Sequence, residues 1–140
     1  MNMTSKLNPY INFNGNTKEA VEFYNQVFGG ELTLSTYGQG GMTKNPAEND
    51  KIMHAQLIAP NGITIMAADT PEGWTRPSDS NISISLSGDN EAELRGYWDK
   101  LADGGKVDQP LVKAPWGDTF GMLTDKFGIR WMVNIAGPKA

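Results

Sequence analysis

The sequence predicts an α+β fold made of two tandem βαβββ modules, because one pattern of turn, helix and strands occurs twice along the chain. In each copy, a helix with an apolar stripe follows a short strand and ends at a pair of glycines. Strands that alternate between apolar and polar residues follow each helix. Equivalent residues lie 73, 74 and 75 positions apart at Gly15 and Gly88, Tyr24 and Trp98, and Gly29 and Gly104. A duplicated module with one or two inserted residues gives this drift.

The first module is predicted at about residues 6–69. Alternating residues from Leu7 to Phe13 predict its first strand. Asn16 and Glu19 have the spacing of a capping pair, so a helix is predicted from Thr17 to Phe28. Further strands are predicted at Glu31–Tyr37, Ile52–Ala59 and Ile63–Ala68, with an irregular loop at Gly38–Lys51 and a tight turn at Pro60–Gly62.

The second module is predicted at about residues 80–136, after a linker at about 70–79. The whole segment Asp69–Asp79 lacks periodicity and contains two prolines and a glycine, which favours a linker. Asn90 and Glu93 repeat the capping spacing before the second helix. Strands are predicted at Asn81–Ser87 and at Lys106–Lys113, where Pro110 indicates a sheet edge, and a β-hairpin at Phe120–Ile135 with its turn at Thr124–Gly128.

The size and composition favour a single domain spanning 1–140, because 140 residues are few for two independently stable domains. The formal charge of −4 is spread along the chain, and no cluster of Lys and Arg could neutralise a row of phosphates, so we expect no nucleic acid partner. No apolar run has the length of a signal peptide or a membrane span, so we expect a cytoplasmic protein without a membrane partner. The sequence has no cysteine, which excludes disulfides and thiolate chemistry.

The segments PYINFNGN, EAVEFYNQVFGGEL, IMHAQL and DKFGIRWMVNI resemble the PhnB-like branch of the glyoxalase, bleomycin-resistance and extradiol-dioxygenase superfamily, also called vicinal oxygen chelate proteins. The resemblance covers nearly the whole chain. It implies the glyoxalase/bleomycin resistance-like fold, with two curved sheets paired around a cleft, and a homodimer. It also implies that enzymes of the superfamily hold a divalent metal in this cleft.

The metal ligands of the superfamily are His, Glu or Gln side chains on the first and last strands of each module. A catalytic site of this kind needs about three protein ligands and one open position. The matching places here contain neither a carboxylate nor an imidazole, so we expect no metal site and no cofactor, although a divalent metal stays possible. These places fall at or near Pro9–Asn12, Thr64–Met66, Asn81–Ser83 and Arg130–Met132.

His54 is the only histidine in the chain and the best candidate for a catalytic residue. It lies on the third predicted strand of its module, away from the superfamily's metal positions. One interpretation is a structural side chain that hydrogen-bonds Gln56, Asn12 or a backbone carbonyl. The other is a ligand donor or general base, because an imidazole exchanges protons near neutral pH. Both interpretations remain open.

Polar strand faces are expected to line the cleft if the apolar faces pack on the helices. The apolar faces carry pairs such as Ile11 and Phe13 or Ile82 and Ile84. In the segment APWGDTF, Asp118 either accepts hydrogen bonds from backbone amides within a turn or contacts a ligand. Trp74 and Met42 lie in loops, where they could cover an apolar ligand but where such residues usually have no role. The predicted ligand-binding residues are Tyr10, Asn12, His54, Gln56, Trp116, Asp118, Phe120 and Met132.

The leading hypothesis is a dimeric protein that binds a small organic molecule without a metal. The alternative is a lyase or isomerase that uses a metal held by His54 with Gln56 and water, or His54 as its only base. A purely structural module is the third. A serine nucleophile has no histidine nearby that the pattern can place, and the glycines at Gly38–Gly41 precede no helix, which argues against nucleophilic and phosphate-binding sites.

Overall fold

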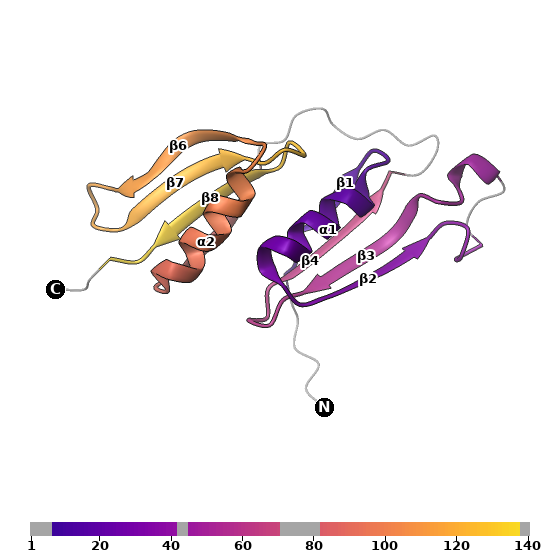
Figure 1. The fold of residues 1–140 in the computed structure, drawn as a ribbon, viewed down its shortest axis with the longest axis horizontal. Coiled ribbons are helices and arrows are strands. Elements are labelled where there is room, and N and C mark those ends of the chain that lie inside the picture. Colours follow the sequence, from indigo (N-terminus) through magenta and orange to yellow (C-terminus); the bar gives the residue numbers. More distant parts are fainter. Residues whose placement is uncertain (1–6, 42–44, 71–81, 138–140) are drawn as a thin grey trace. The chain divides into compact units, whose positions relative to one another are not determined.

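The computed structural model describes residues 7–41, 45–70 and 82–137. The chain separates into two compact units, residues 1–77 and 78–140. Each unit contains one four-stranded sheet and one long helix (Figure 1). This is the predicted α+β fold with the βαβββ order present twice. Whether both units form one domain stays a prediction.

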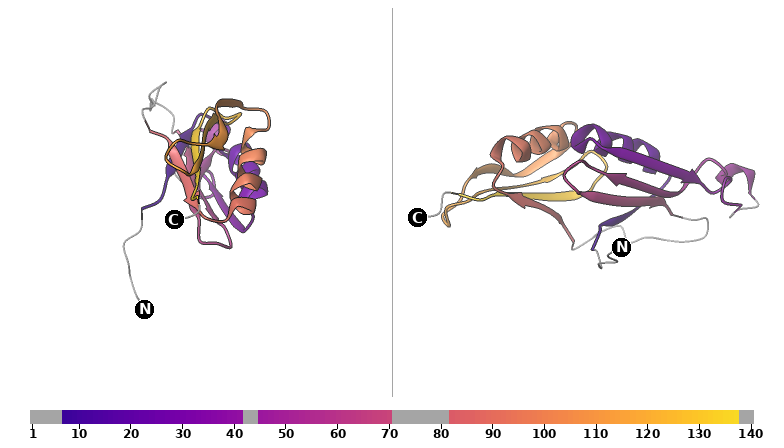
Figure 2. Two further views of the ribbon diagram at one scale, coloured as in Figure 1. Left: turned by 90° about the vertical axis from the view of Figure 1, so that its left-hand side faces the viewer. Right: turned by 90° about the horizontal axis from the view of Figure 1, so that it is seen from below.

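In the first unit, α1 packs on one face of a mixed sheet with the strand order β1-β4-β3-β2. The pair β1 and β4 is parallel, whereas the other pairs are antiparallel. Figure 2 shows α1 against one face of this sheet. The elements are β1 (Tyr10–Phe13), α1 (Thr17–Phe28), β2 (Glu31–Thr36), a 3-10 turn η1 (Pro46–Glu48), β3 (Ile52–Ile58) and β4 (Thr64–Asp69).

In the second unit, the strand order is β5-β8-β7-β6, which repeats the order and directions of the first sheet. Pro110 lies in β6, an edge strand, as its missing N–H predicted. Trp131, Val133 and Leu86 are buried beneath α2. The elements are β5 (Ile84–Gly88), α2 (Glu91–Ala102), β6 (Lys106–Lys113), β7 (Thr119–Thr124) and β8 (Arg130–Ile135).

The glycine pair after each helix has the same steric role in both units. A Cβ atom on Gly30 would overlap the carbonyl oxygen of Ile58, and a Cβ on Gly105 would overlap that of Thr124. Both carbonyls end the third strand of their module, and the residue after each glycine pairs with that strand end, so the chain enters each edge strand directly against its neighbour. The duplication inferred from sequence spacing therefore extends to backbone packing.

The predicted caps of the two helices differ in outcome. Asn90 caps α2, since its side chain accepts a hydrogen bond from the Glu93 N–H at 3.1 Å. The predicted cap at Asn16 is wrong, because its side chain makes no cap hydrogen bond. Asp69 of β4 accepts the hydrogen bonds at the start of α1 instead. A residue 53 positions away along the chain has taken the place of the local cap.

Several predicted boundaries shift where a partner strand ends. Asp69, predicted in the linker, is the last residue of β4 and is buried. The strand predicted from Asn81 begins at Ile84, because Ile84 pairs with Trp131 near the start of β8. Ile82 consequently lies outside the sheet and is 71% exposed, so its predicted packing on the helix is wrong. The loop before β3 contains η1. Most of the predicted linker, with Trp74, and also Met42 lie outside the described residues.

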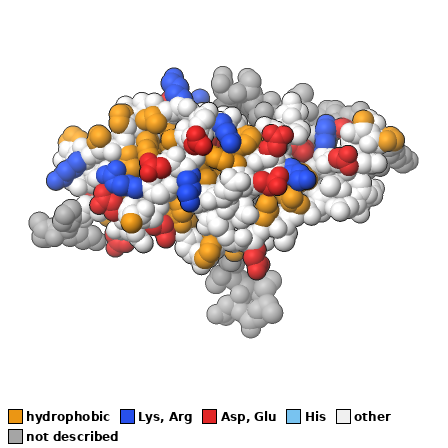
Figure 3. Space-filling view, in the orientation of Figure 1, with side chains coloured by type: hydrophobic (Ala, Val, Ile, Leu, Met, Phe, Trp, Pro, Cys, Tyr) orange, Lys and Arg blue, Asp and Glu red, His pale blue; other side chains and the backbone are white. Residues whose placement is uncertain are grey.

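Acidic and basic side chains are interspersed on the face shown in Figure 3. Neither sign of charge is collected in one patch on this face. Among the residues that the structure describes, no helix is long and apolar enough to cross a membrane.

Candidate functional site

Tyr10 and His54 form a hydrogen-bonded pair on the face of the first sheet that α1 does not cover. The Tyr10 hydroxyl lies 3.3 Å from Nδ1 of His54, and the two ring centroids are 5.8 Å apart. Tyr10 is in β1 and His54 in β3, so the pair spans the intervening strand β4. In the register of β1 and β4, Tyr10 lies beside Met66 and Asn12 beside Ala68. The sheet order thus creates a polar pair 44 residues apart in sequence.

The hydrogen bond limits the protonation states that the pair can adopt. If the tyrosine hydroxyl donates to Nδ1, the neutral imidazole carries its proton on Nε2. If Nδ1–H donates to the tyrosine oxygen, Nε2 of His54 is a proton acceptor. The second arrangement is the one that a general base requires.

Two predicted ligand-binding amides accompany the pair on this face. Gln56 lies beside Met66 of β4 and Thr33 of β2, and Tyr10 lies on the other side of Met66. Asn12 lies two residues after Tyr10 in β1, on the same face of the strand. Within the described residues, neither the Asn12 nor the Gln56 side-chain amide makes a hydrogen bond, and both residues are at least partly exposed to solvent. These amides can therefore bond a bound molecule without first breaking an internal contact.

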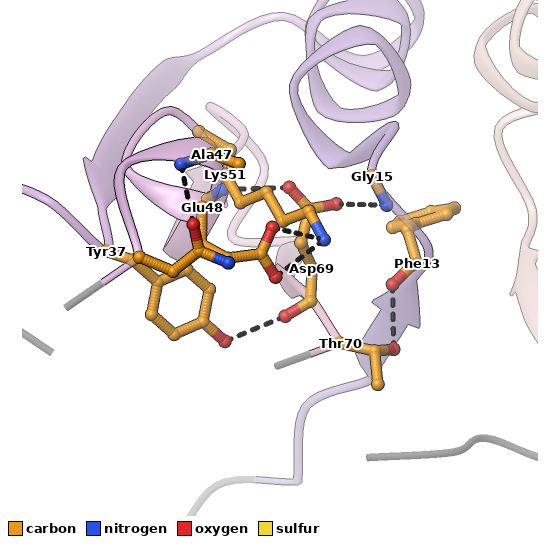
Figure 4. A network of polar contacts seen from close by, with 10 residues as sticks. Phe13, Gly15, Tyr37, Ala47, Glu48, Lys51, Asp69 and Thr70 are labelled. Carbon is orange, nitrogen blue, oxygen red and sulfur yellow. Dashed lines mark hydrogen bonds and ion pairs between the residues drawn. The ribbon is translucent and has the colours of Figure 1, made fainter. Parts of the chain in front are cut away.

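Tyr37 is a functional candidate that the sequence analysis missed. Its hydroxyl donates a hydrogen bond of 2.9 Å to the backbone carbonyl of Asp69 (Figure 4). Burial raises the pKa of the Tyr37 phenol above its ordinary value, and the Asp69 carboxylate and the Tyr10 phenol raise it further. In the sequence, the one indication of this role is that Tyr37 follows Thr33 and Ser35 at intervals of two residues along the predicted strand, which places the three side chains on one face. Tyr37 links the end of β2 to the end of β4, close to the Tyr10 phenol.

The loop after Tyr37 is fixed at the same end of the sheet. Lys51 forms a partly buried ion pair of 2.8 Å with Glu48 of η1. The Tyr37 N–H donates to the Lys51 carbonyl, which closes the base of the loop. Figure 4 shows these groups beside Asp69 and the first turn of α1. The loop base therefore has defined polar contacts on each side.

The other predicted ligand-binding residues lie together on the second unit. Trp116 is 64% exposed, and its ring packs edge-on against Phe120 with 5.8 Å between centroids. Met132 lies beside Met122 of β7 and Ser85 of β5. This surface presents aromatic and thioether groups, whereas the Tyr10 and His54 face of the first unit presents hydrogen-bonding groups.

Asp118 has structural contacts that match one of the two interpretations of its turn. Its carboxylate accepts hydrogen bonds from the side chain of Asn134 at 3.0 Å and from the backbone N–H of Gly137 at 2.9 Å. These bonds hold the turn between β6 and β7 to the end of β8. A direct contact between Asp118 and a ligand stays a prediction.

The residues at the superfamily's metal positions do not fit a divalent cation. At the described positions they include Tyr10, Met66, Arg130 and Met132. A thioether is too soft a donor for manganese or magnesium, and a guanidinium repels a cation. Among the described residues, no group of three or more His, Asp or Glu side chains could hold a metal ion.

The chain is similar to solved and curated proteins over nearly its whole length. Protein YjdN of Escherichia coli (strain K12) is 31% identical over 141 residues, which cover 92% of this chain and 94% of that protein. Protein PA1353 of Pseudomonas aeruginosa is 39% identical with a TM-score of 0.78, covering 94% of this chain and 98% of the other. A PhnB protein of Bacillus cereus is 26% identical with a TM-score of 0.71, covering 94% and 100%.

The match at the level of families spans residues 6–133 and is to the family described as the Glyoxalase/Bleomycin resistance protein/Dioxygenase superfamily. This range runs from β1 into β8 and includes the Tyr10 and His54 pair and the Trp116 turn. The chain therefore belongs to the glyoxalase/bleomycin resistance/dioxygenase superfamily and has PhnB-like relatives.

Proposed function

We propose that this protein binds a small organic molecule without the catalytic metal of its superfamily. The observation that carries the proposal is the Tyr10 and His54 pair, which lies beside two amides, Asn12 and Gln56, that make no hydrogen bond among the described residues. Strands hold all four side chains, so their spacing is set before a ligand arrives. Polar groups placed in this way orient a ligand, which is their usual role in binding sites.

We propose that the aromatic and thioether groups of the second unit form an apolar contact surface of that unit. Trp116, Phe120 and Met132 offer flat and deformable surfaces, and Asp118 keeps the Trp116 turn in place. We further propose that the protein acts as a cytoplasmic homodimer, as the resemblance to its superfamily implies. Sedimentation equilibrium across a range of protein concentrations tests the dimer directly; a monomer throughout contradicts this part.

Isothermal titration calorimetry against a panel of metabolites and antibiotics tests the proposed site. The wild type, His54→Ala and Trp116→Ala are compared with Lys18→Ala, whose side chain is exposed on α1. For each site variant we expect a ligand whose Kd rises by about tenfold, equivalent to about 1.4 kcal/mol, while the control leaves that Kd unchanged. The absence of any ligand, or binding that neither site variant changes, would count against the proposed function.

The second candidate is a lyase or isomerase, and one of the two tautomers that the hydrogen bond at His54 Nδ1 permits is suited to it. With Nδ1–H donated to Tyr10, the Nε2 atom can take a proton from a substrate. A metal bound by His54, Gln56 and water is the other route to this activity. Elemental analysis of protein purified without a histidine tag separates the two: stoichiometric zinc, nickel or manganese supports the metalloenzyme and contradicts the metal-free site.

A further inference from the structure

The face around Tyr10 and His54 carries hydrogen-bonding groups but little formal charge. In the described part of the first unit, four residues are register partners on neighbouring strands and form one row across the sheet: Tyr10, Met66, Gln56 and Thr33. None of these four residues is Asp, Glu, Lys or Arg. Glu31 lies at the far end of the edge strand β2. A ligand on this face can therefore form hydrogen bonds, but no charged side chain of either sign lies at the centre of the face.

The charged groups beside this face are already compensated. Asp69 accepts four hydrogen bonds on its carboxylate and is 2% exposed. Lys51 pairs with Glu48 at 2.8 Å. An anionic ligand would have to separate this ion pair to gain a counter-charge, and a cationic ligand would compete with Lys51 for Glu48. Desolvating an ionised ligand at the uncharged centre costs free energy, and no side chain there forms an ion pair that would offset this cost.

The Tyr10 and His54 pair offers one outward donor and one outward acceptor in either neutral tautomer. When the Tyr10 hydroxyl donates to Nδ1, Nε2–H is the donor and the phenol oxygen is the acceptor. When Nδ1–H donates to the phenol oxygen, the hydroxyl is the donor and Nε2 is the acceptor. A carboxamide carries this same combination, one C=O and one N–H on adjacent atoms. The pair can match an amide in either orientation by exchanging tautomers.

Asn12 and Gln56 add the same chemistry. Each side-chain amide carries an acceptor oxygen and an NH₂ donor. Two amides can join by paired N–H···O=C bonds, which an ionised carboxylate cannot reproduce, since it only accepts. The side chains that make no hydrogen bond in the described part of this unit thus include amides of the kind that would pair with another amide.

We propose that the ligand is an uncharged molecule with adjacent N–H and C=O groups, such as a carboxamide, ureide or lactam, bound on the Tyr10, His54 and Gln56 face. The inference rests on the proposed function and specifies its ligand class. Anions, cations and a second copy of the chain are the competing occupants.

Three probes with one common ring distinguish these cases: benzamide, benzoate and phenylphosphonate. Each is titrated into ¹⁵N-labelled wild-type protein at pH 7.5 and followed by the backbone amide resonances. We expect benzamide to shift resonances of β1, β3 and β4 with a Kd on the order of 1 mM, as befits a ligand of this size. Benzoate and phenylphosphonate should bind at least about tenfold more weakly.

Gln56→Glu supplies a variant that reverses the selectivity, and Gln109→Glu in the edge strand β6 is its matched control. A carboxylate at position 56 has no N–H, so benzamide binding should fall by about tenfold, while the cation benzamidinium should gain affinity. Gln109→Glu should alter neither. Because both changes add the same charge, a general electrostatic effect would appear in both variants.

Three other outcomes would contradict the inference, and each has a different meaning. Preferred binding of benzoate or phenylphosphonate on this face contradicts the uncharged ligand but leaves a small-molecule site in place. Shifts of the same resonances on raising the protein concentration alone indicate a second copy on this face. If none of the three probes shifts these resonances, both the ligand class and the proposed site are wrong.

Discussion

The carboxylate of Asp69, at the end of β4, caps α1 through Thr17. Its Oδ1 atom accepts hydrogen bonds from the Thr17 N–H at 3.0 Å and from the Thr17 hydroxyl at 2.7 Å. Oδ1 also accepts the Gly15 N–H, and Oδ2 accepts the Ile52 N–H. One buried side chain therefore joins the start of α1, the start of β3 and the end of β4, as Figure 4 shows in part.

Asp69→Asn should destabilise the first unit. The new NH₂ group would face N–H donors, leaving buried groups without acceptors, and we expect a loss of about 3 kcal/mol in the free energy of unfolding. Urea denaturation followed by circular dichroism measures the change. Asp50→Asn, at an exposed position in the same unit, is the control and should stay within about 0.5 kcal/mol of wild type. Equal stability of both variants would contradict the capping role.

Asn90→Ala and Asn16→Ala should differ although the two residues occupy matching places. Asn90 accepts the Glu93 N–H, so its truncation should cost about 1 kcal/mol. Asn16 makes no cap hydrogen bond, so its truncation should change stability by less than about 0.5 kcal/mol. Thermal unfolding of the two variants measures both effects. An equal loss of stability in the two variants would support the local cap at Asn16 that the sequence predicted.

Gly105→Ala should destabilise the second unit for steric reasons. The added methyl group would overlap the Thr124 carbonyl oxygen and lie 3.0 Å from the Cα of Asp125. We expect a loss of about 2 kcal/mol by chemical denaturation. Gly96→Ala is the matched control within α2, where nothing lies within 4 Å of the new Cβ. There the gain in helix propensity should stabilise the protein by up to about 1 kcal/mol. If Gly105→Ala left the stability unchanged, the backbone at Gly105 and at Thr124 would be able to move apart without a cost in free energy.

Tyr37→Phe should reduce the loss of stability in alkaline solution. The pKa of Tyr37 is raised from its ordinary value of 10.0, chiefly by burial, so the folded state resists ionisation more than the unfolded chain. This contribution to stability is fully present below pH 10 and is lost as the pH rises through the folded pKa. Phenylalanine cannot ionise, so the variant should lose less stability between pH 8 and about 11.

At neutral pH, the same variant lacks the hydrogen bond to the Asp69 carbonyl and should be about 1 kcal/mol less stable than wild type. Urea unfolding at both pH values separates the two effects. The other tyrosines are the same in both proteins, so the difference between the two pH dependences isolates Tyr37. Identical pH dependence in both proteins would show that the Tyr37 environment does not oppose ionisation.

Local sequence patterns predicted the elements well because helices and hairpins depend on near neighbours. The bounds of α1 and β6 agree with the predicted ranges, and Asn90 caps α2 as its spacing indicated. Errors occur where a distant residue decides the local structure. Asp69 replaces Asn16 as the cap of α1, and the start of β8 sets where β5 can begin.

The sequence by itself determined the two-module α+β fold and placed Tyr10, Asn12, His54 and Gln56 on polar strand faces, because alternation along a strand needs no knowledge of its neighbours. Tertiary structure alone decided that Tyr10 and His54 share a hydrogen bond, since this contact depends on β4 lying between β1 and β3. It also decided the role of Tyr37, whose partner is a backbone carbonyl 32 residues away. Sheet order follows from the packing of the whole unit, and no local pattern specifies it.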